Sequence, residues 1–107
     1  MDESQFNRLA DAMLASIEAA LEASTADFDY EIKPGGVIEL DFGAGGKIII
    51  NRHTAAREIW VAARSGGFHF KPQDGLWVAT RDGATLAQVL ERCMNDQAGR
   101  PVLLNLS

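Results

Sequence analysis

Apolar residues recur at intervals of three and four near the N-terminus and at alternate positions through the middle of the chain. The first pattern predicts an amphipathic helix of about 20 residues that ends near residues 23–24. Its expected apolar stripe is Phe6, Leu9, Ala10, Met13, Ile17, Ala20 and Leu21. Ser4 can cap this helix, although a start near Asp2 fits the pattern equally well.

The middle of the chain follows a period of two, which predicts a series of short strands. We expect them at residues 28–32, 37–42, 47–52, 58–63, 68–70 and 76–79. Turn-forming residues separate the strands, among them Pro34–Gly36 and the glycine-rich segment 43–46, which indicates a hairpin. Turns this short favour an antiparallel sheet.

A second amphipathic helix is predicted from about Thr85 to Ala98, with Gly99 as a natural stop. Its apolar side includes the only cysteine, Cys93, which we expect to be buried. Both helices must cover one face of the antiparallel sheet. The predicted fold is therefore a two-layer α/β sandwich of the α+β class, with about six strands, in one domain spanning residues 1–107.

The C-terminal segment 102–106 is too apolar for a loose tail, and we expect it to fold back into the groove between the two helices. No apolar run approaches the roughly 20 residues needed to cross a bilayer. Residues 1–5 lack the basic and then apolar pattern of a secretion signal. We therefore expect a cytoplasmic protein with no membrane partner.

Charge is distributed unevenly along the chain. The 15 acidic and ten basic residues give a formal net charge of −5. Residues 1–31 hold eight of the acids and a single base, Arg8, which leaves this segment at −7. Such an end should repel phosphate backbones, so nucleic acid is not expected as a ligand. It should instead attract metal cations and basic protein partners.

Two sets of these carboxylates are expected to lie together. Glu18 and Glu22 share one side of the predicted helix, because they are four residues apart. Asp27, Asp29 and Glu31 alternate by two, so they point to one face of the first strand. If that strand is an edge strand next to the helix, the two sets form one continuous anionic strip.

Carboxylate oxygen suits iron as Fe²⁺ or Fe³⁺, and also Mn²⁺, Mg²⁺ and Ca²⁺. Nothing in the sequence forms a closed cage with histidine or cysteine ligands. We therefore expect weak, exchangeable and poorly selective binding of such cations, iron and other divalent ions among them.

Two tryptophans fall on predicted strands. Trp60 and Trp77 are both expected on the sheet face opposite the core residues. A tryptophan on a strand more often packs on its neighbours than binds a ligand. Trp60 can also form, with Asn51 and Arg52, an open sheet face for a protein partner.

The remaining candidates for chemistry are few. His53 and His69 are not spaced as a pair of metal ligands, and each is expected to be structural or at the surface. His69 is the better peripheral iron contact, because it points outward between its neighbours on the strand. No serine or cysteine nucleophile has a plausible base, and no phosphate-binding glycine loop is present. The sequence therefore predicts a protein that is not an enzyme.

The order and spacing of these motifs resemble those of bacterial frataxin, the CyaY family. The resemblance covers nearly the whole chain. It includes Phe6–Asp11, Gly35–Val37, Lys47–Arg52, Ile59–Ala62, Gly66–Phe70 and the strand around Trp77. No single stretch is specific, but six in the right order are a strong signal.

The resemblance implies the same sandwich and a role in iron–sulfur cluster assembly. Proteins of this family bind iron weakly through an acidic ridge, dock on the cysteine desulfurase through that ridge, and modulate cluster formation on the scaffold protein. Carried over by position, the ridge is Glu18, Glu22, Asp27, Asp29 and Glu31, with Asp11 and Glu3 as outer members. Ala19 and Ala23 stand where acids are common in the family, so this ridge is thinner.

The resemblance implies that the desulfurase contacts four ridge residues, whereas Asn51, Arg52 and Trp60 offer a surface to the scaffold protein. The four are Glu18, Glu22, Asp27 and Asp29. A ferroxidase or iron-storage protein is an alternative, although the thin ridge counts against it. A third possibility is an acidic interaction module with incidental metal binding. We expect a monomer, and the sequence leaves open whether iron drives oligomers.

Overall fold

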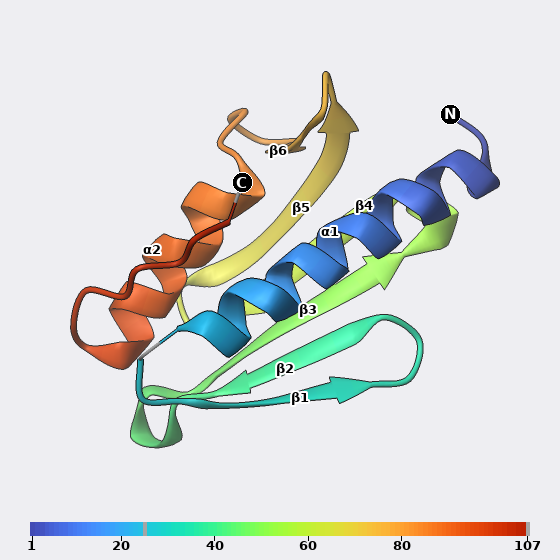
Figure 1. Cartoon of the computed structure of the whole chain (residues 1–107). Helices are drawn as coiled ribbons and strands as arrows, with labels where there is room; N and C mark the ends of the chain where they lie inside the picture. Colours follow the sequence, from blue (N-terminus) through green and yellow to red (C-terminus); the bar gives the residue numbers. More distant parts are fainter. Residues whose placement is uncertain (25, 107) are drawn as a thin grey trace.

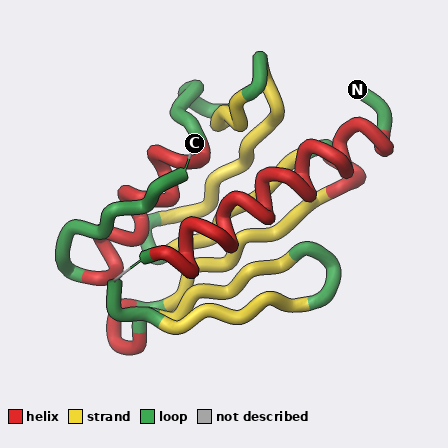
Figure 2. Tube along the Cα trace, in the orientation of Figure 1, coloured by secondary structure: helices red, strands yellow, loops and turns green. Residues whose placement is uncertain are grey.

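The computed structural model describes residues 1–24 and 26–106 and confirms the predicted two-layer sandwich (Figures 1 and 2). Helices α1 (Glu3–Ala23) and α2 (Leu86–Ala98) lie on the same face of a six-stranded sheet. The strands are β1 (Asp29–Lys33), β2 (Val37–Asp41), β3 (Lys47–His53), β4 (Glu58–Ala63), β5 (Gly66–Gln73) and β6 (Leu76–Ala79). Each strand pairs antiparallel with the next, so β1 and β6 are the two edges.

The first helix begins at Glu3 because Asp2 caps it. The Asp2 carboxylate accepts the Gln5 backbone N–H at 2.8 Å, and the Gln5 side chain accepts the Asp2 N–H at 3.1 Å. This reciprocal pair is a capping box, so Ser4 lies inside the helix and is not its cap. Within the described residues, no helix has both the length and the apolar character to span a bilayer.

One member of the predicted apolar stripe is wrong. Leu9 is 42% exposed, whereas Leu14, which the stripe omitted, is buried. The buried side of α1 is Phe6, Ala10, Leu14, Ile17, Ala20 and Leu21. At about 100° per residue, Leu9 lies roughly 90° around the helix from the centre of that set. Its side chain therefore reaches only the margin of the core.

The position of Trp77 also differs from the prediction. Trp77 is 8% exposed and faces the helices, where its ring meets that of Phe6 edge-on with centroids 5.9 Å apart. In the sheet it lies opposite Pro72, two residues beyond the buried Phe70. Strand β6 is apolar at every position, so alternation alone did not show which of its faces is buried.

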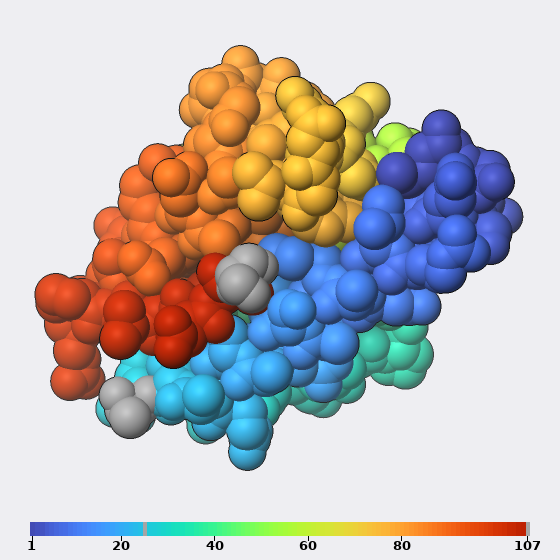
Figure 3. Space-filling view, turned by 45° about the horizontal axis from the view of Figure 1, so that its top comes forward, coloured from blue at the N-terminus to red at the C-terminus, as the bar shows by residue number. Residues whose placement is uncertain are grey.

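The second helix and the C-terminal segment are as predicted. Cys93 is buried, and Gly99 ends α2 in a left-handed conformation. The segment 102–106 folds back between α1 and α2, where Figure 3 shows it (red) between the two helices. Its backbone N–H groups at Val102 and Leu104 donate to side chains of α2. These bonds hold the side chains of the same two residues against the core.

We predict that Leu104→Ala lowers the free energy of unfolding by about 2–3 kcal/mol, because its side chain is 6% exposed and leaves a cavity. Leu103→Ala is the matched control. Leu103 is 81% exposed, and its truncation should cost within about 0.5 kcal/mol. Urea denaturation measures both. Equal losses would contradict the docked position of the segment.

Candidate functional site

The carboxylates of the edge strand point away from α1. In the β1–β2 ladder Tyr30 lies opposite Leu40, which is fully buried beneath the helices. Tyr30 therefore faces α1, and its neighbours Asp29 and Glu31 face the opposite side of the sheet. The expected single strip is thus divided by the edge of the sheet, with helix carboxylates on one side and strand carboxylates on the other.

On the helix side, Tyr30 joins the edge strand to the acids of α1. Its hydroxyl donates a hydrogen bond to the carboxylate of Glu22, which is exposed. This bond, together with partial burial and the negative charges of Glu22 and Glu18, raises the pKa of Tyr30. The phenol therefore stays protonated. The same two glutamates make the electrostatic potential negative on this side of β1. Among the described residues, neither Glu18 nor Glu22 forms a salt bridge.

Asp11 is compensated, unlike Glu18 and Glu22. Its carboxylate forms a salt bridge with the guanidinium of Arg52. Arg52 lies opposite the buried Ile59 and follows Ile50 on the helix side of β3. The prediction that Arg52 shares an open face with Asn51 and Trp60 is therefore wrong, because adjacent residues of a strand point to opposite faces.

The face of the sheet that points away from the helices is called the outer face. On this face, β1 and β2 bring like charges together. Asp29 lies opposite Asp41, and Glu31 lies opposite Glu39. Glu39 is neutralised, because Lys33 approaches it at 3.0 Å and Lys47 at 3.5 Å. The hydrogen bond from Lys33 lowers the pKa of Glu39, and the same bond raises the pKa of Lys33. The paired lysines leave three acids of this face without a counter-ion in the described chain: Asp29, Glu31 and Asp41.

Glu3, an outer member of the predicted ridge, and Asp27, one of its five main members, are both exposed. Glu3 lies in the first turn of α1, and Asp27 precedes β1. Across residues 1–24 and 26–106, no three side chains of histidine, cysteine, aspartate or glutamate are placed to hold one ion together. A cation on this surface would therefore take one or two carboxylates and keep most of its water. Such coordination is weak and exchangeable.

The centre of the outer sheet face holds a stack of three rings that the sequence did not reveal. Trp60 lies between His53 and His69, with ring centroids 4.0 Å and 4.4 Å apart and planes within 8° of parallel. The indole N–H of Trp60 donates to Glu58 at 2.7 Å. Asn51 is the cross-strand partner of Trp60, so the two share this face as predicted. Strand register is the signal that could have placed His69 against Trp60.

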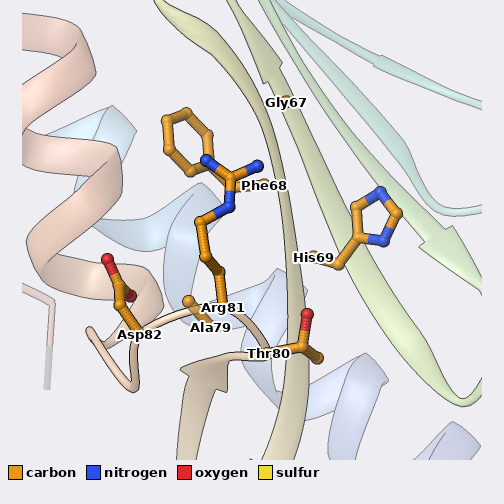
Figure 4. A pocket seen from close by; sticks show the side chains of 7 residues that line it. All are labelled: Gly67, Phe68, His69, Ala79, Thr80, Arg81 and Asp82. Carbon is orange, nitrogen blue, oxygen red and sulfur yellow. The ribbon is translucent and has the colours of Figure 1, made fainter.

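Figure 4 shows a pocket beside β5, with His69 among the residues that line it. Phe68 and His69 point to opposite sides of the strand, which confirms that His69 faces outward. A hollow of about 120 Å³ lies between β5 and the segment after β6. Arg81 and Asp82 bring opposite charges to its wall, so it has no net charge preference of its own.

Two helices on one face of a six-stranded antiparallel sheet, with unpaired carboxylates on the first helix and the edge strand, define a small α+β sandwich with an acidic edge. A family model described as Frataxin-like domain matches residues 1–100. The chain therefore belongs to the frataxin-like family.

Individual relatives agree with this membership. The iron-sulfur cluster assembly protein CyaY of Dechloromonas aromatica (strain RCB) is 53% identical over 104 residues, which cover 97% of this chain and 99% of that protein. The structure of frataxin from Psychromonas ingrahamii matches with a TM-score of 0.85 and 31% identity, over 95% of this chain and 96% of that one. Trimeric frataxin from the yeast Saccharomyces cerevisiae, complexed with ferrous, matches with a TM-score of 0.67 and 28% identity, over 94% and 88% of the two chains.

Proposed function

We propose that the protein works in iron–sulfur cluster assembly, as a non-catalytic iron-dependent regulator or iron presenter that docks on the cysteine desulfurase. Membership of the frataxin-like family supports the pathway, because its CyaY relatives carry the name of iron–sulfur cluster assembly proteins. The uncompensated carboxylates on both sides of β1 carry the proposal for the site.

The docking surface in this proposal is the acidic edge, defined as Glu18, Glu22, Asp27, Asp29 and Glu31. None of these five forms a salt bridge in the described part of the chain. An unpaired carboxylate gains more from a basic partner than one that must first leave its own lysine or arginine. Asp11 is such a paired acid, so we place it outside the docking surface.

Iron binding in this proposal is weak because the two sides of β1 bind separately. Glu18 and Glu22 can offer oxygen ligands on the helix side, and Asp29 and Glu31 on the outer side. Each pair leaves most coordination positions to water, which suits an ion that is passed on to a partner. The scaffold protein is proposed to contact Asn51 and Trp60 on the outer sheet face.

The test removes each pair of charges without changing side-chain size. We expect Glu18→Gln/Glu22→Gln and Asp29→Asn/Glu31→Gln each to weaken binding to the desulfurase about tenfold, because each loses two charges at the edge. Asp74→Asn/Asp82→Asn removes the same charge from the distant end of the sheet and should change affinity less than about twofold. Affinities are measured at near-physiological salt, since screening hides weaker surface effects.

An anaerobic Fe²⁺ titration, mapped residue by residue by NMR, runs in parallel on the same variants. Resonances around each carboxylate pair should shift in the wild type and stay still in the variant that lacks that pair. If desulfurase binding survives in a variant that no longer binds iron, the docking role of those acids is wrong. If Fe²⁺ moves no resonance of the wild type, the metal role is wrong.

A metal-independent interaction module is the second candidate. It is favoured by the lack, within the described residues, of any three side chains placed to share one ion. In that case the protein should bind the desulfurase equally well in chelator and in excess Fe²⁺. An iron-dependent affinity would exclude this candidate.

A further inference from the structure

The three-ring stack of His53, Trp60 and His69 constrains how the outer sheet face can meet a partner. Imidazole rings cover both faces of the indole at 4.0 Å and 4.4 Å. A partner side chain therefore cannot stack on Trp60 unless one histidine leaves. A partner can therefore reach only the edge of the indole, which lies between the two imidazoles.

Strand register builds the stack. His69 lies directly opposite Trp60 in the β4–β5 ladder. His53 lies two residues beyond Asn51, the partner of Trp60 in the β3–β4 ladder, so it meets the indole along the diagonal. Aromatic side chains reach across both the direct and the diagonal spacing. Residues on two strands thus hold an indole that projects from a third.

Glu58 fixes the remaining rotation of the indole. Its carboxylate accepts the indole N–H at 2.7 Å, and it lies 3.5 Å from Nδ1 of His69 and 3.9 Å from the ammonium of Lys71. The Glu58 side chain is only 13% exposed, so its charge is used within the face and is not offered to a partner.

The ring of His53 turns one nitrogen away from solvent. Its Nδ1 atom is buried and has no hydrogen-bond partner within the described residues. An N–H left there without an acceptor would be costly, which favours the tautomer with its hydrogen on Nε2. A partner that fits this surface supplies an apolar spot for the indole edge.

We infer that His53 and His69 are positioning residues that clamp Trp60 edge-on in the surface that meets the iron–sulfur scaffold protein. This inference rests on the proposed function, which places Asn51 and Trp60 in that contact. The complementary patch of the scaffold protein is an apolar spot that receives the indole edge. The histidines act through Trp60, because they hold its ring in the one orientation that leaves the indole edge free.

The test compares loss of the ring with its replacement by another ring. His53→Ala and His69→Ala should each weaken binding to the scaffold protein about tenfold, as expected for support of a central tryptophan. His53→Phe and His69→Phe keep a flat ring and should recover affinity to within about threefold. Gln73→Ala, on the same face of β5 but outside the stack, should bind as the wild type does.

The indole N–H resonance of Trp60 gives a second readout that is independent of binding. Trp60→Phe assigns it, since the chain has two tryptophans. The alanine variants should shift this resonance and make Trp60 more accessible to a collisional quencher. The phenylalanine variants should restore both signals.

The outcomes separate the inference from the function on which it rests. If Trp60→Ala leaves scaffold binding unchanged, the proposed contact itself fails. If Trp60→Ala weakens binding but the histidine-to-alanine variants bind normally with a displaced Trp60 resonance, the positioning role is overturned. The positioning role is also overturned if phenylalanine restores the resonance but not the affinity, because the imidazoles would then contact the partner directly.

Discussion

Replacing Phe6 with alanine is expected to lower the free energy of unfolding by about 3–5 kcal/mol, the largest effect that we predict for a single substitution. Phe6 is fully buried, and its ring packs edge-on against Trp77 at 5.9 Å between centroids. This contact joins the first turns of α1 to the edge strand β6. Its loss leaves a cavity that a rigid sheet edge cannot close, and it removes an aromatic pair.

Leu9→Ala is the control, because Leu9 lies one turn further along α1 and is 42% exposed. Its truncation should cost less than about 1 kcal/mol, since little area leaves the core. Chemical denaturation followed by far-UV circular dichroism measures both variants. Similar losses for Phe6 and Leu9 would show that α1 is rotated from the orientation described.

Gly45→Ala is expected to destabilise the fold by about 3 kcal/mol, at the upper end of the usual cost of overpacking. A methyl group at Gly45 would overlap the backbone carbonyl oxygen of Gln97 at the end of α2. The buried Gln97 side chain stabilises this contact between the turn and α2 through hydrogen bonds. Its amide donates to the carbonyls of Gly45 and Lys47 at 3.2 and 3.1 Å and accepts the Arg64 N–H at 3.0 Å. Pushing α2 away would break bonds to buried groups that have no water to replace them.

Gly67→Ala tests whether the cost comes from the contact or from the loss of glycine. Nothing lies within 4 Å of a methyl group at Gly67, and its backbone conformation is one that any residue adopts. The change should be neutral or stabilise by up to about 1 kcal/mol, because alanine restricts the unfolded chain. Thermal or urea unfolding compares the two. Gly45→Ala at wild-type stability would contradict the close approach of the β2–β3 turn to α2.

Much of the fold could be predicted because it depends on local periods. The helical spacing around Ala10 and Ile17, the alternation around Ile59 and Val61, and the stop at Gly99 each determine structure within a few residues. The hydrophobic pattern gave a wrong prediction where a strand has no polar residues. Strand β6 has no polar residue to mark its outer face, and this hid the burial of Trp77.

The members of the candidate site were available from the sequence, but their arrangement was not. The concentration of acids in residues 1–31 and the family resemblance named the acidic edge. Neither could show that Tyr30 faces α1 while Asp29 and Glu31 turn away, because this depends on which face of β1 the helix covers. The pairing of Asp11 with Arg52 was equally hidden, since 41 residues separate them along the chain.

By itself the sequence determined the order of helices and strands, the apolar residues available for a core, and the excess of negative charge near the N-terminus. Only the tertiary structure decided which charges are neutralised, which face each strand acid takes, and that two histidines enclose Trp60. The physical reason is the separation along the chain of the residues that interact. Helical and strand periods arise between neighbours, whereas ion pairs and ring stacks need the register of strands and the placement of helices that distant parts of the chain set together.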